Sequence, residues 1–405
     1  MRRSGTPAAL MLILALWPVT ARAGFTETAP ADTFVLDESV NLSQLRHRYD
    51  NDGQRTTLID PVKRYELGGG LQGVLTPKAL VNFLVLINKL QYGVLDNLTV
   101  AVGIPVVLYT DIALDLQWTP GDYQPQLGRP YSEDDFWAWA ESLGQPKPEG
   151  GRSNQGVLSD IIIGLRYRFS DDVAALAGGP LALAVTVMGA LPTGEQAYPE
   201  EVATTGTTMW DLHSQGELSF HLAADYAFGG RLQDRLTLGL DLFYEFLFEH
   251  EYTTPTGERH PLLLSHASYA GDHYRLDPGD FAGMALALDA VIWPGPALAT
   301  WIVDGDAARA AALPPLLCAT LRYTYTHLGQ SDWTSDSAIW DWEQEKLWRP
   351  GLKNTLWGRI QISLLRVGVP VQLYFAYRNQ SWLHGRNSRA ADVFSAGLVV
   401  PARFW

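Results

Sequence analysis

The sequence has a single cysteine, Cys318, among its 405 residues. One thiol cannot form a disulfide within the chain, and there is no cysteine pair to build a zinc or iron–sulfur site. Basic residues are also in deficit, because 30 Lys and Arg stand against 44 Asp and Glu and the formal net charge is −14. A nucleic-acid binder needs a basic surface to neutralise phosphates, so we expect no nucleic-acid partner.

Charged residues of all kinds make up only 18% of the chain, yet no long apolar helix can be drawn beyond residue 23. The stretch 281–303 contains Asp289 and then the Pro-Gly-Pro of 294–296. The stretch 79–87 is shorter than the ~20 residues that a spanning helix needs. We therefore predict no membrane-spanning helix, although aromatic residues are abundant, with 14 tryptophans.

The first residues predict export. Arg2 and Arg3 precede the apolar run 8–17, and residues 21–23 read Ala-Arg-Ala, a small-x-small cleavage site. This order is that of a secretory signal peptide at residues 1–23, with a mature chain that starts at Gly24. The alternative interpretation, a membrane anchor, needs a longer apolar run than this one. An exported chain without helical spans is periplasmic, secreted or a barrel in the bacterial outer membrane.

Alternation with a period of two favours the barrel. Leucines and aromatics occupy every second position from Leu236 to Phe248, whereas Asp241 and Glu245 lie on the other face. A tilted strand that crosses a bilayer needs roughly 9 to 11 residues, more than the usual strand of a soluble protein. A soluble sandwich, the alternative, has no need to repeat such long strands. Twelve segments are predicted as strands: 65–75, 79–92, 97–110, 158–170, 180–192, 214–229, 234–248, 281–293, 315–327, 352–365, 368–379 and 392–404.

The connections agree with an all-β, antiparallel, up-and-down transmembrane β-barrel. Short connections alternate with long ones, as in outer-membrane barrels, whose turns are short on the periplasmic side and long outside. We place the barrel at residues 61–405, with ten or fourteen strands as alternatives to twelve. Residues 24–60 are interpreted as an N-terminal arm, a plug or an extra strand. An apolar stripe that includes Phe394, Leu398 and Phe404 runs to the C-terminal Trp405 and is typical of the last strand of such barrels.

Three segments resemble a known family. They are Tyr92–Pro105, Ser159–Phe169 and Leu191–Gly194, in this order and spacing. They look like the outer-membrane barrel family named for the meta-pathway of phenol degradation. The resemblance implies a transporter-like barrel that admits aromatic or other hydrophobic compounds. It implies no catalytic residues.

Charges on the polar face of the predicted strands are candidates for the lining of the lumen. Acidic residues lie on the sixth to eighth strands and basic ones mainly on the ninth to eleventh, so opposite walls would carry opposite charge and produce a transverse field. The alternative is that these charges pair and fill a narrow barrel as structural salt bridges. The candidates are Arg166, Arg168, Asp225, Asp241, Glu245, Asp289, Arg322, Lys353, Arg359 and Arg378.

The long outer loop 111–157 carries Trp118, Trp137 and Trp139, and the acidic residues after Ser132 predict a short capped helix. These tryptophans are candidates for a surface where apolar solutes dock, or else for aromatics at the lipid headgroups. Histidines at 250, 260, 266 and 273 lack the spacing of a metal site. His384 and Ser388 lack the further groups that hydrolysis needs. We expect no enzymatic activity, no cofactor and no metal.

The sequence therefore predicts an outer-membrane channel for the passive uptake of small, hydrophobic or aromatic compounds. A closed barrel with a structural or surface-interaction role is the alternative. The expected partners are the lipid bilayer of the outer membrane, a small-molecule solute and, during biogenesis, the outer-membrane assembly machinery.

Overall fold

The computed structural model describes residues 24–58, 61–65, 70–121, 123–124, 127–142, 147, 151–153, 156–194, 216–229, 235–253, 273–277, 279–295, 314–330, 332–334, 350–380 and 382–403. The predicted signal peptide at residues 1–23 lies outside these ranges. Among the described residues, no helix is both long enough and apolar enough to cross a membrane.

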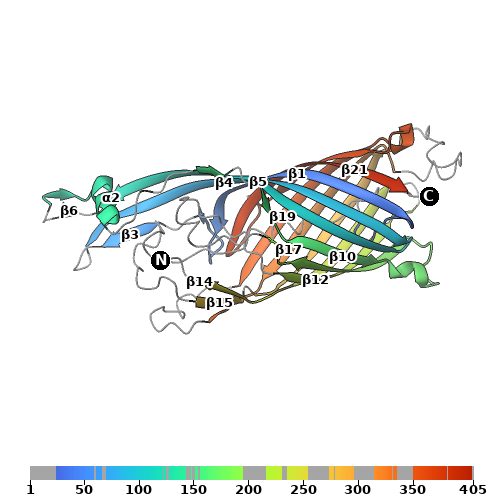
Figure 1. Ribbon diagram of the computed structural model, residues 1–405, viewed down its shortest axis with the longest axis horizontal. Coiled ribbons are helices and arrows are strands. Elements are labelled where there is room, and N and C mark those ends of the chain that lie inside the picture. The colour runs from blue at the N-terminus through green and yellow to red at the C-terminus, as the bar shows by residue number, and fades with distance from the viewer. Residues whose placement is uncertain are drawn as a thin grey trace.

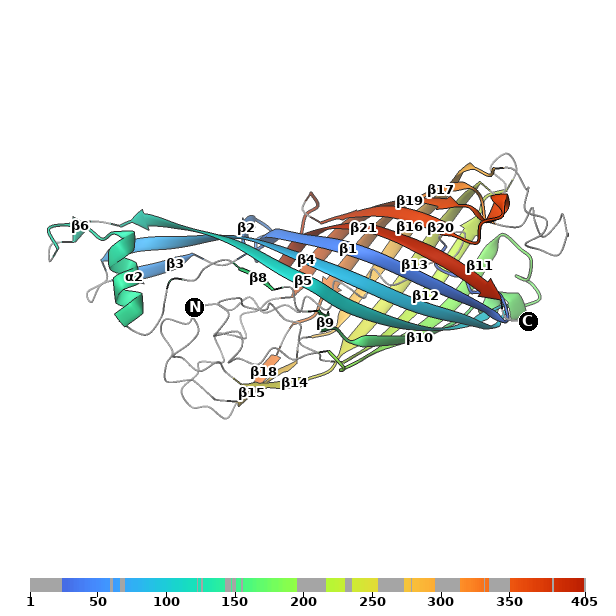
Figure 2. The same cartoon turned by 45° about the horizontal axis from the view of Figure 1, so that its top comes forward.

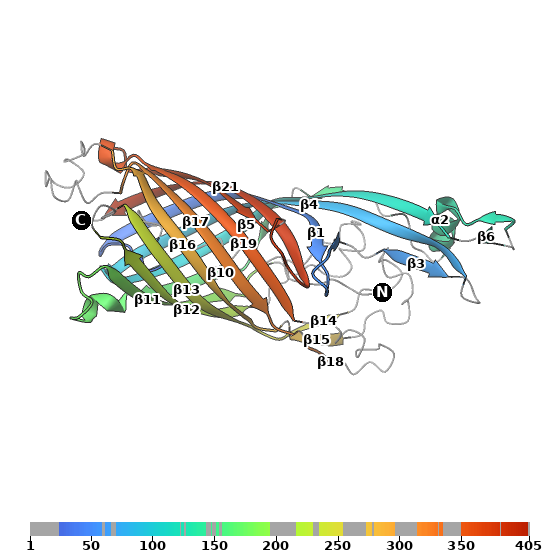
Figure 3. The same ribbon diagram turned by 180° about the vertical axis from the view of Figure 1, so that it is seen from behind.

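Twelve antiparallel strands form one closed barrel (Figures 1 and 3). Closure is complete because β1 pairs with β21 on one side and with β4 on the other. This confirms the predicted fold and strand number. In order around the barrel, the strands are β1 (Thr33–Tyr49), β4 (Leu71–Leu95), β5 (Leu98–Pro120), β10 (Ile161–Tyr167), β11 (Leu181–Leu191), β12 (Glu217–Ala227), β13 (Leu236–Leu247), β16 (Phe281–Trp293), β17 (Leu317–Leu328), β19 (Gly351–Ser363), β20 (Gln372–Asn379) and β21 (Ser388–Arg403).

The two faces of each barrel strand differ in chemistry. On β13, Leu238 and Leu242 are each 44% exposed, whereas Asp241 and Glu245 face inward and are 8% and 1% exposed. Exposed leucines, valines and phenylalanines recur outward on the other barrel strands. A continuous apolar outer face around a polar interior is the pattern of a barrel in lipid, where closure leaves no backbone edge unpaired.

The first strand of the barrel was not among the predicted strands. Residues 33–49, in the segment taken as an arm, a plug or an extra strand, form β1, so the barrel begins at Thr33 rather than at residue 61. The alternation of β1 is hidden in the sequence because Asp37, Glu38 and Ser39 are polar on both faces of the strand. Glu38 lies between the outward residues Leu36 and Val40.

The predicted strands 65–75 and 79–92 are one strand, β4, of 25 residues. The break was predicted at residues 76–78, which include Pro77. In the structure, residues 76–80 of β4 pair only with β5, because β3 pairs with residues 71–75 and β1 with residues 81–92. Proline lacks an amide hydrogen and is tolerated on such an unpaired edge. The count of twelve is right because this merged pair offsets the missed β1.

The apolar run at residues 79–87, rejected as a helix, serves both faces of β4. Val81, Phe83, Val85 and Ile87 point inward and pack in an apolar cluster with residues that include Leu58. The intervening Leu84 and Leu86 belong to the outward parity. The cluster, which we call the apolar inner zone, lies along β4 toward the outer end of β1, where Leu45 joins it.

The two ends of the barrel differ. Short turns, including the 3-10 helices η1 (Phe169–Asp172) and η5 (Leu365–Val367), lie at one end, which is periplasmic by the usual asymmetry of such barrels. At the other end, β4 and β5 continue as a ribbon well beyond the barrel (Figure 2). The remaining elements are β2 (Arg55–Thr57), β3 (Val62–Tyr65), β6 (Tyr123–Gln124), β7 (Arg129–Pro130), α2 (Glu133–Ser142), β8 (Gly151–Ser153), β9 (Val157–Leu158), β14 (His250–Thr253), β15 (His273–Asp277) and β18 (Asp332–Thr334).

Candidate solute pathway in the barrel lumen

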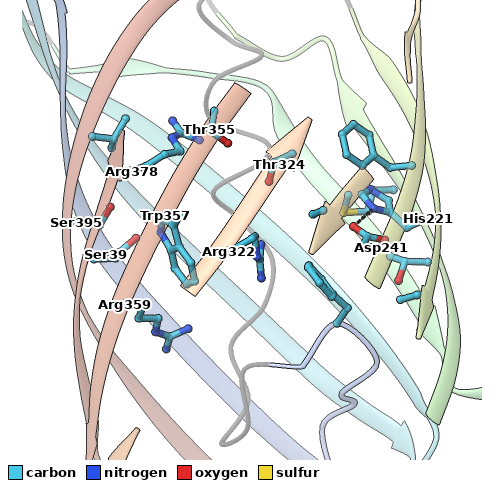
Figure 4. Close-up of a pocket in the computed structure, with 18 of the residues that line it drawn as sticks. Ser39, His221, Asp241, Arg322, Thr324, Thr355, Trp357, Arg359, Arg378 and Ser395 are labelled. Atoms are coloured by element: carbon cyan, nitrogen blue, oxygen red, sulfur yellow. Dashed lines mark hydrogen bonds and ion pairs between the residues drawn. The ribbon is translucent and has the colours of Figure 1, made fainter. Parts of the chain in front are cut away.

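A cavity of about 90 Å³ lies inside the barrel, and we call it the chamber. A buried water molecule occupies roughly 10–15 Å³ of such space, so the chamber has room for several waters or a small solute group. Side chains from at least eight strands line it (Figure 4). The lining combines polar groups such as Ser39 and Thr324 with aromatic rings, among them Phe243 and Trp357.

Basic side chains and aromatic rings form one wall of the chamber. Arg322, Arg359 and Arg378 extend from the neighbouring strands β17, β19 and β20 (Figure 4). The guanidinium carbon of Arg322 lies 5.0 Å from the centre of the Trp357 ring, and that of Arg359 lies 4.3 Å from the centre of the Tyr374 ring. Stacking on rings favours a guanidinium group in a space with little water.

Acidic side chains gather on the adjoining strands β12, β13 and β16. The His221 Nδ1 atom lies 3.0 Å from the Asp241 Oδ2 atom. The Thr320 hydroxyl donates a hydrogen bond of 2.5 Å to Asp289. Glu245 is buried nearby on β13. The part of the wall next to the three arginines is therefore mainly acidic, and Figure 4 shows Asp241 on it.

The structure brings together nine of the ten predicted lumen charges. Asp225, Asp241, Glu245 and Asp289 lie on one arc of strands, and Arg322, Lys353, Arg359 and Arg378 lie on the next. Arg166 is buried on β10, beyond the acidic arc. The acidic and basic side chains therefore lie on adjacent arcs of the barrel, not on the opposite walls that were predicted.

Arg168 is the exception. It lies in the periplasmic turn before η1. Its Nη2 atom is 2.7 Å from a carboxylate oxygen of Asp171 and contacts the Asp96 carbonyl at 3.4 Å. The parity that placed Arg168 in the lumen fails here because β10 ends at Tyr167.

Four buried charges of the barrel strands were missed: Glu217 on β12, Arg389 on β21, and two that bear on the separation of charge, Asp37 and Lys89. Asp37 is inward-facing on β1 and accepts a hydrogen bond of 3.1 Å from the Tyr374 hydroxyl. Lys89 is buried on the inward face of β4. Asp37 was missed because β1 was not recognised as a barrel strand. Both reduce the separation of charge. The acidic Asp37 lies near Arg359, since both contact Tyr374, and the basic Lys89 lies outside the basic arc.

Residues 24–32, which we call the lumen segment, run inside the periplasmic end of the barrel. Asp225 on β12 accepts hydrogen bonds from the Phe25 amide at 3.1 Å and from the Thr26 amide at 2.7 Å. Thr99 on β5 accepts one of 2.7 Å from the Ala29 amide. The segment therefore bridges two sides of the barrel and narrows its lumen.

Further contacts join the lumen segment to the chamber. Arg166 donates a hydrogen bond of 3.0 Å from Nη1 to the Glu27 carbonyl. The Phe25 ring lines the chamber, and its centre lies 4.4 Å from the guanidinium carbon of Arg322. Of the predicted interpretations of residues 24–60, this segment matches a plug and β1 matches an extra strand.

The three tryptophans predicted to dock solutes lie outside the barrel, at the end of the ribbon. We call this region the distal module: β3, residues 71–78 of β4, residues 114–120 of β5, and α2. The Phe136 ring lies 5.3 Å from Trp118, 4.9 Å from Trp137 and 5.7 Å from Trp139. These side chains form, with Leu75, an apolar cluster. They therefore pack mainly against one another.

The first turn of α2 is fixed by a network around Asp135. Its carboxylate accepts hydrogen bonds from the Ser132 hydroxyl at 2.7 Å and amide at 2.8 Å, and from the Arg129 guanidinium at 2.5 and 2.7 Å. The Ser132 hydroxyl accepts one in return from the Asp135 amide at 3.2 Å. This is the reciprocal capping arrangement at the N-terminus of a helix, and it confirms the predicted capped helix after Ser132.

We predict that the order of α2 depends on the charge of Asp135. The hydrogen bonds from Arg129 and Ser132 hold the pKa of this carboxyl well below its usual range. Because the pKa is lowered in the folded module, the stabilisation is present above about pH 4 and is lost as the pH falls toward the lowered value. Asp135→Ala should therefore speed hydrogen exchange of the α2 amides several-fold at pH 7. Asp134→Ala is the control, since Asp134 is exposed. Equal exchange in both variants would contradict the prediction.

Of the candidates for other chemistry, Ser388 lies among the described residues. The Ser388 hydroxyl donates to the Leu352 carbonyl at 2.9 Å, which is a structural contact at the start of β21. No group of metal-ligating side chains that could hold an ion occurs among the described residues. Two of the four histidines, at 260 and 266, lie outside those residues.

The chain was compared with known proteins. No family model matches it, and no curated protein matches it. The COG4313 outer membrane channel from Pseudomonas putida F1 superposes with a TM-score of 0.51 at 11% identity, over 94% of this chain and 98% of that chain. The Pseudomonas putida toluene transporter TodX gives a TM-score of 0.34 at 9% identity, over 96% of this chain and 99% of that chain. The CymD monoaromatic hydrocarbon channel gives a TM-score of 0.34 at 9% identity, over 92% of this chain and 90% of that chain. The first likeness shows the fold, that of an outer-membrane β-barrel.

Proposed function

We propose that this protein is an outer-membrane channel for the passive uptake of small hydrophobic or aromatic compounds. The observation that carries the proposal is the division of the lumen into two parts. An apolar inner zone lies along β4 toward the outer end of the barrel, and a chamber lined with charges and aromatic rings lies in the barrel interior. A solute with an apolar body and a polar group finds suitable contacts in both.

The family named for the meta-pathway of phenol degradation remains part of this proposal. Its support is the resemblance of three sequence segments, Tyr92–Pro105, Ser159–Phe169 and Leu191–Gly194. The structure places parts of all three on the barrel strands β4, β5, β10 and β11. No described element suggests catalysis, and channel activity accounts for the closed barrel without it.

The test is the conductance of the purified, refolded mature chain in a planar bilayer. Stable current steps that benzyl alcohol blocks more strongly than glycerol does would support uptake of aromatic solutes. Both compounds carry a hydroxyl group, but only benzyl alcohol has an aromatic ring. Swelling of liposomes in the same solutes then measures their passage directly. Aromatic solutes that neither block the current nor enter the liposomes would contradict the proposal.

We predict that reversing one charge of the basic wall changes ion selectivity. Arg359→Glu removes a cation that faces the chamber and adds an anion there. The field of the wall then favours cations, so the permeability ratio of K⁺ to Cl⁻ should rise several-fold. Arg235→Glu, at an exposed position in a periplasmic turn, is the control. Unchanged selectivity together with a lower melting temperature would instead show that the lumen charges act as structural pairs.

A second function is favoured by different observations. The lumen segment narrows the periplasmic end, and the distal module projects from the other end (Figure 2). A closed barrel that presents the distal module for surface interaction would have both features. Silence from barrels verified as inserted in the bilayer would favour this function over uptake.

A further inference from the structure

Asp225 is the point where the described chain first contacts the barrel wall. Its two carboxylate oxygens accept three hydrogen bonds from the lumen segment: from the Phe25 amide, the Thr26 amide and the Thr26 hydroxyl, the last at 2.6 Å. Successive backbone amides that converge on one anion form a nest. The nest here belongs to the residues that directly follow the predicted cleavage site.

Gly24 precedes this nest and lies close to the same carboxylate. A Cβ atom on residue 24 would lie 2.4 Å from the Asp225 Oδ2 atom and 3.0 Å from its carboxyl carbon. No such contact is tolerated without displacing the carboxylate. The backbone of residue 24 therefore lies beside the Asp225 carboxylate, directly before the two amides that bind it.

The charge of Asp225 needs a partner. The side chain is only 6% exposed, and its three hydrogen bonds come from neutral groups. No ion pair in the described part of the chain includes Asp225. Arg166 and Arg322 lie near enough to attract the carboxylate through space, and the Nε and Nη1 atoms of Arg166 donate to Thr186 and to the Glu27 carbonyl. A buried carboxylate is costly without a cation, and an ammonium group at Gly24 would supply one.

We propose that the mature chain begins at Gly24 and that its α-ammonium group binds the Asp225 carboxylate, which fixes the N-terminus inside the lumen. Hydrolysis of the Ala23–Gly24 peptide bond creates this group. Water supplies the hydroxyl oxygen of the new Ala23 carboxylate, and the Gly24 nitrogen takes up protons to become the ammonium. Before cleavage, the same nitrogen is a neutral amide. Processing therefore converts it into a cation beside the Asp225 carboxylate.

The test uses the full chain, exported and purified from membranes. Mass spectrometry first identifies the N-terminal residue, expected to be Gly24. An amine-acetylating reagent is then applied at neutral pH to the folded protein, and the labelled fraction of the N-terminal peptide is followed with time. We expect labelling about tenfold slower than in the same chain unfolded, because an amine bound to a carboxylate stays protonated and shielded.

Two variants remove the contact in different ways. Asp225→Asn keeps the shape of the side chain and removes its charge, and an alanine inserted between Ala23 and Gly24 moves the ammonium group by one residue. Both should restore fast labelling. Asp160→Asn is the matched control: it changes another buried carboxylate that accepts a backbone amide, from Gly194 at 3.0 Å, and it touches no residue of the lumen segment. It should leave labelling slow.

Folding of each variant is checked by its heat-dependent mobility on a gel, and the insertion variant serves if Asp225→Asn does not fold. A mature N-terminus other than Gly24, or fast labelling of the folded unmodified chain, would overturn the proposal. Slow labelling that persists in both variants would also overturn it. None of these readouts depends on transport, so a failure of the uptake function leaves the result intact.

Discussion

Removal of the lumen segment is expected to raise the single-channel conductance several-fold. A mature chain that lacks residues 25–31 loses the bridge between Asp225 on β12 and Thr99 on β5, and it loses the Phe25 ring from the chamber. β1 begins at Thr33 and its pairing with β21 is unaffected, so the barrel should close as before. The measurement is the step size of the current in a planar bilayer at fixed salt concentration.

Phe25→Ala gives a graded comparison. It removes the ring that lies over Arg322 and leaves the backbone hydrogen bonds of the segment in place. The conductance should therefore rise less than in the deletion. If the deletion leaves the conductance of inserted barrels unchanged, the narrowest point lies elsewhere, and the apolar inner zone around Val85 is the next element to test.

Phe136→Ala is expected to unfold the distal module and leave the barrel intact. Phe136 is fully buried and contacts the rings of Trp118, Trp137 and Trp139. Truncation of a buried phenylalanine to alanine costs about 3–5 kcal/mol. The helix cannot tolerate such a loss, because this single cluster with Phe136 at its centre is what packs α2 against the ribbon. Hydrogen exchange of α2 should become fast while that of β13 and β16 stays slow.

The control for Phe136→Ala is the loss of an apolar side chain that is not buried. Leu127→Ala removes an apolar side chain that is already exposed in the same region, so it should leave α2 protected. Slow exchange of α2 in Phe136→Ala would show that the ribbon alone holds the helix. Fast exchange in the barrel strands would show that the module and the barrel are one cooperative unit.

The course of most barrel strands followed from the period of two alone. β16 spans residues 281–293, as predicted, because Leu286 and Leu288 alternate with small residues and Asp289 along its whole length. The lumen charges followed for the same reason: on a strand that separates lipid from an interior, a charged residue strongly favours the interior face. Nine of the ten predicted charges are therefore inward, and Arg168 differs because it lies beyond the end of its strand.

Other features could not be read from any local pattern. β1 carries polar residues on both faces, and its identity as a strand depends on the partners β4 and β21, which are distant in sequence. A proline such as Pro77 predicts a break in a strand that is paired on both edges. Only the arrangement of β1 and β3 shows that β4 has one unpaired edge at this position.

The sequence by itself determined most of the membrane-spanning strands and, on those strands, the side that carries charge, because burial in lipid imposes an alternation on neighbouring residues. Only the tertiary structure decided where three aromatic tryptophans pack, that residues 24–32 enter the lumen, and that Asp225 holds the start of that segment. These contacts join residues up to 200 positions apart. They depend on closure of the barrel, which brings the wall and the N-terminal segment together.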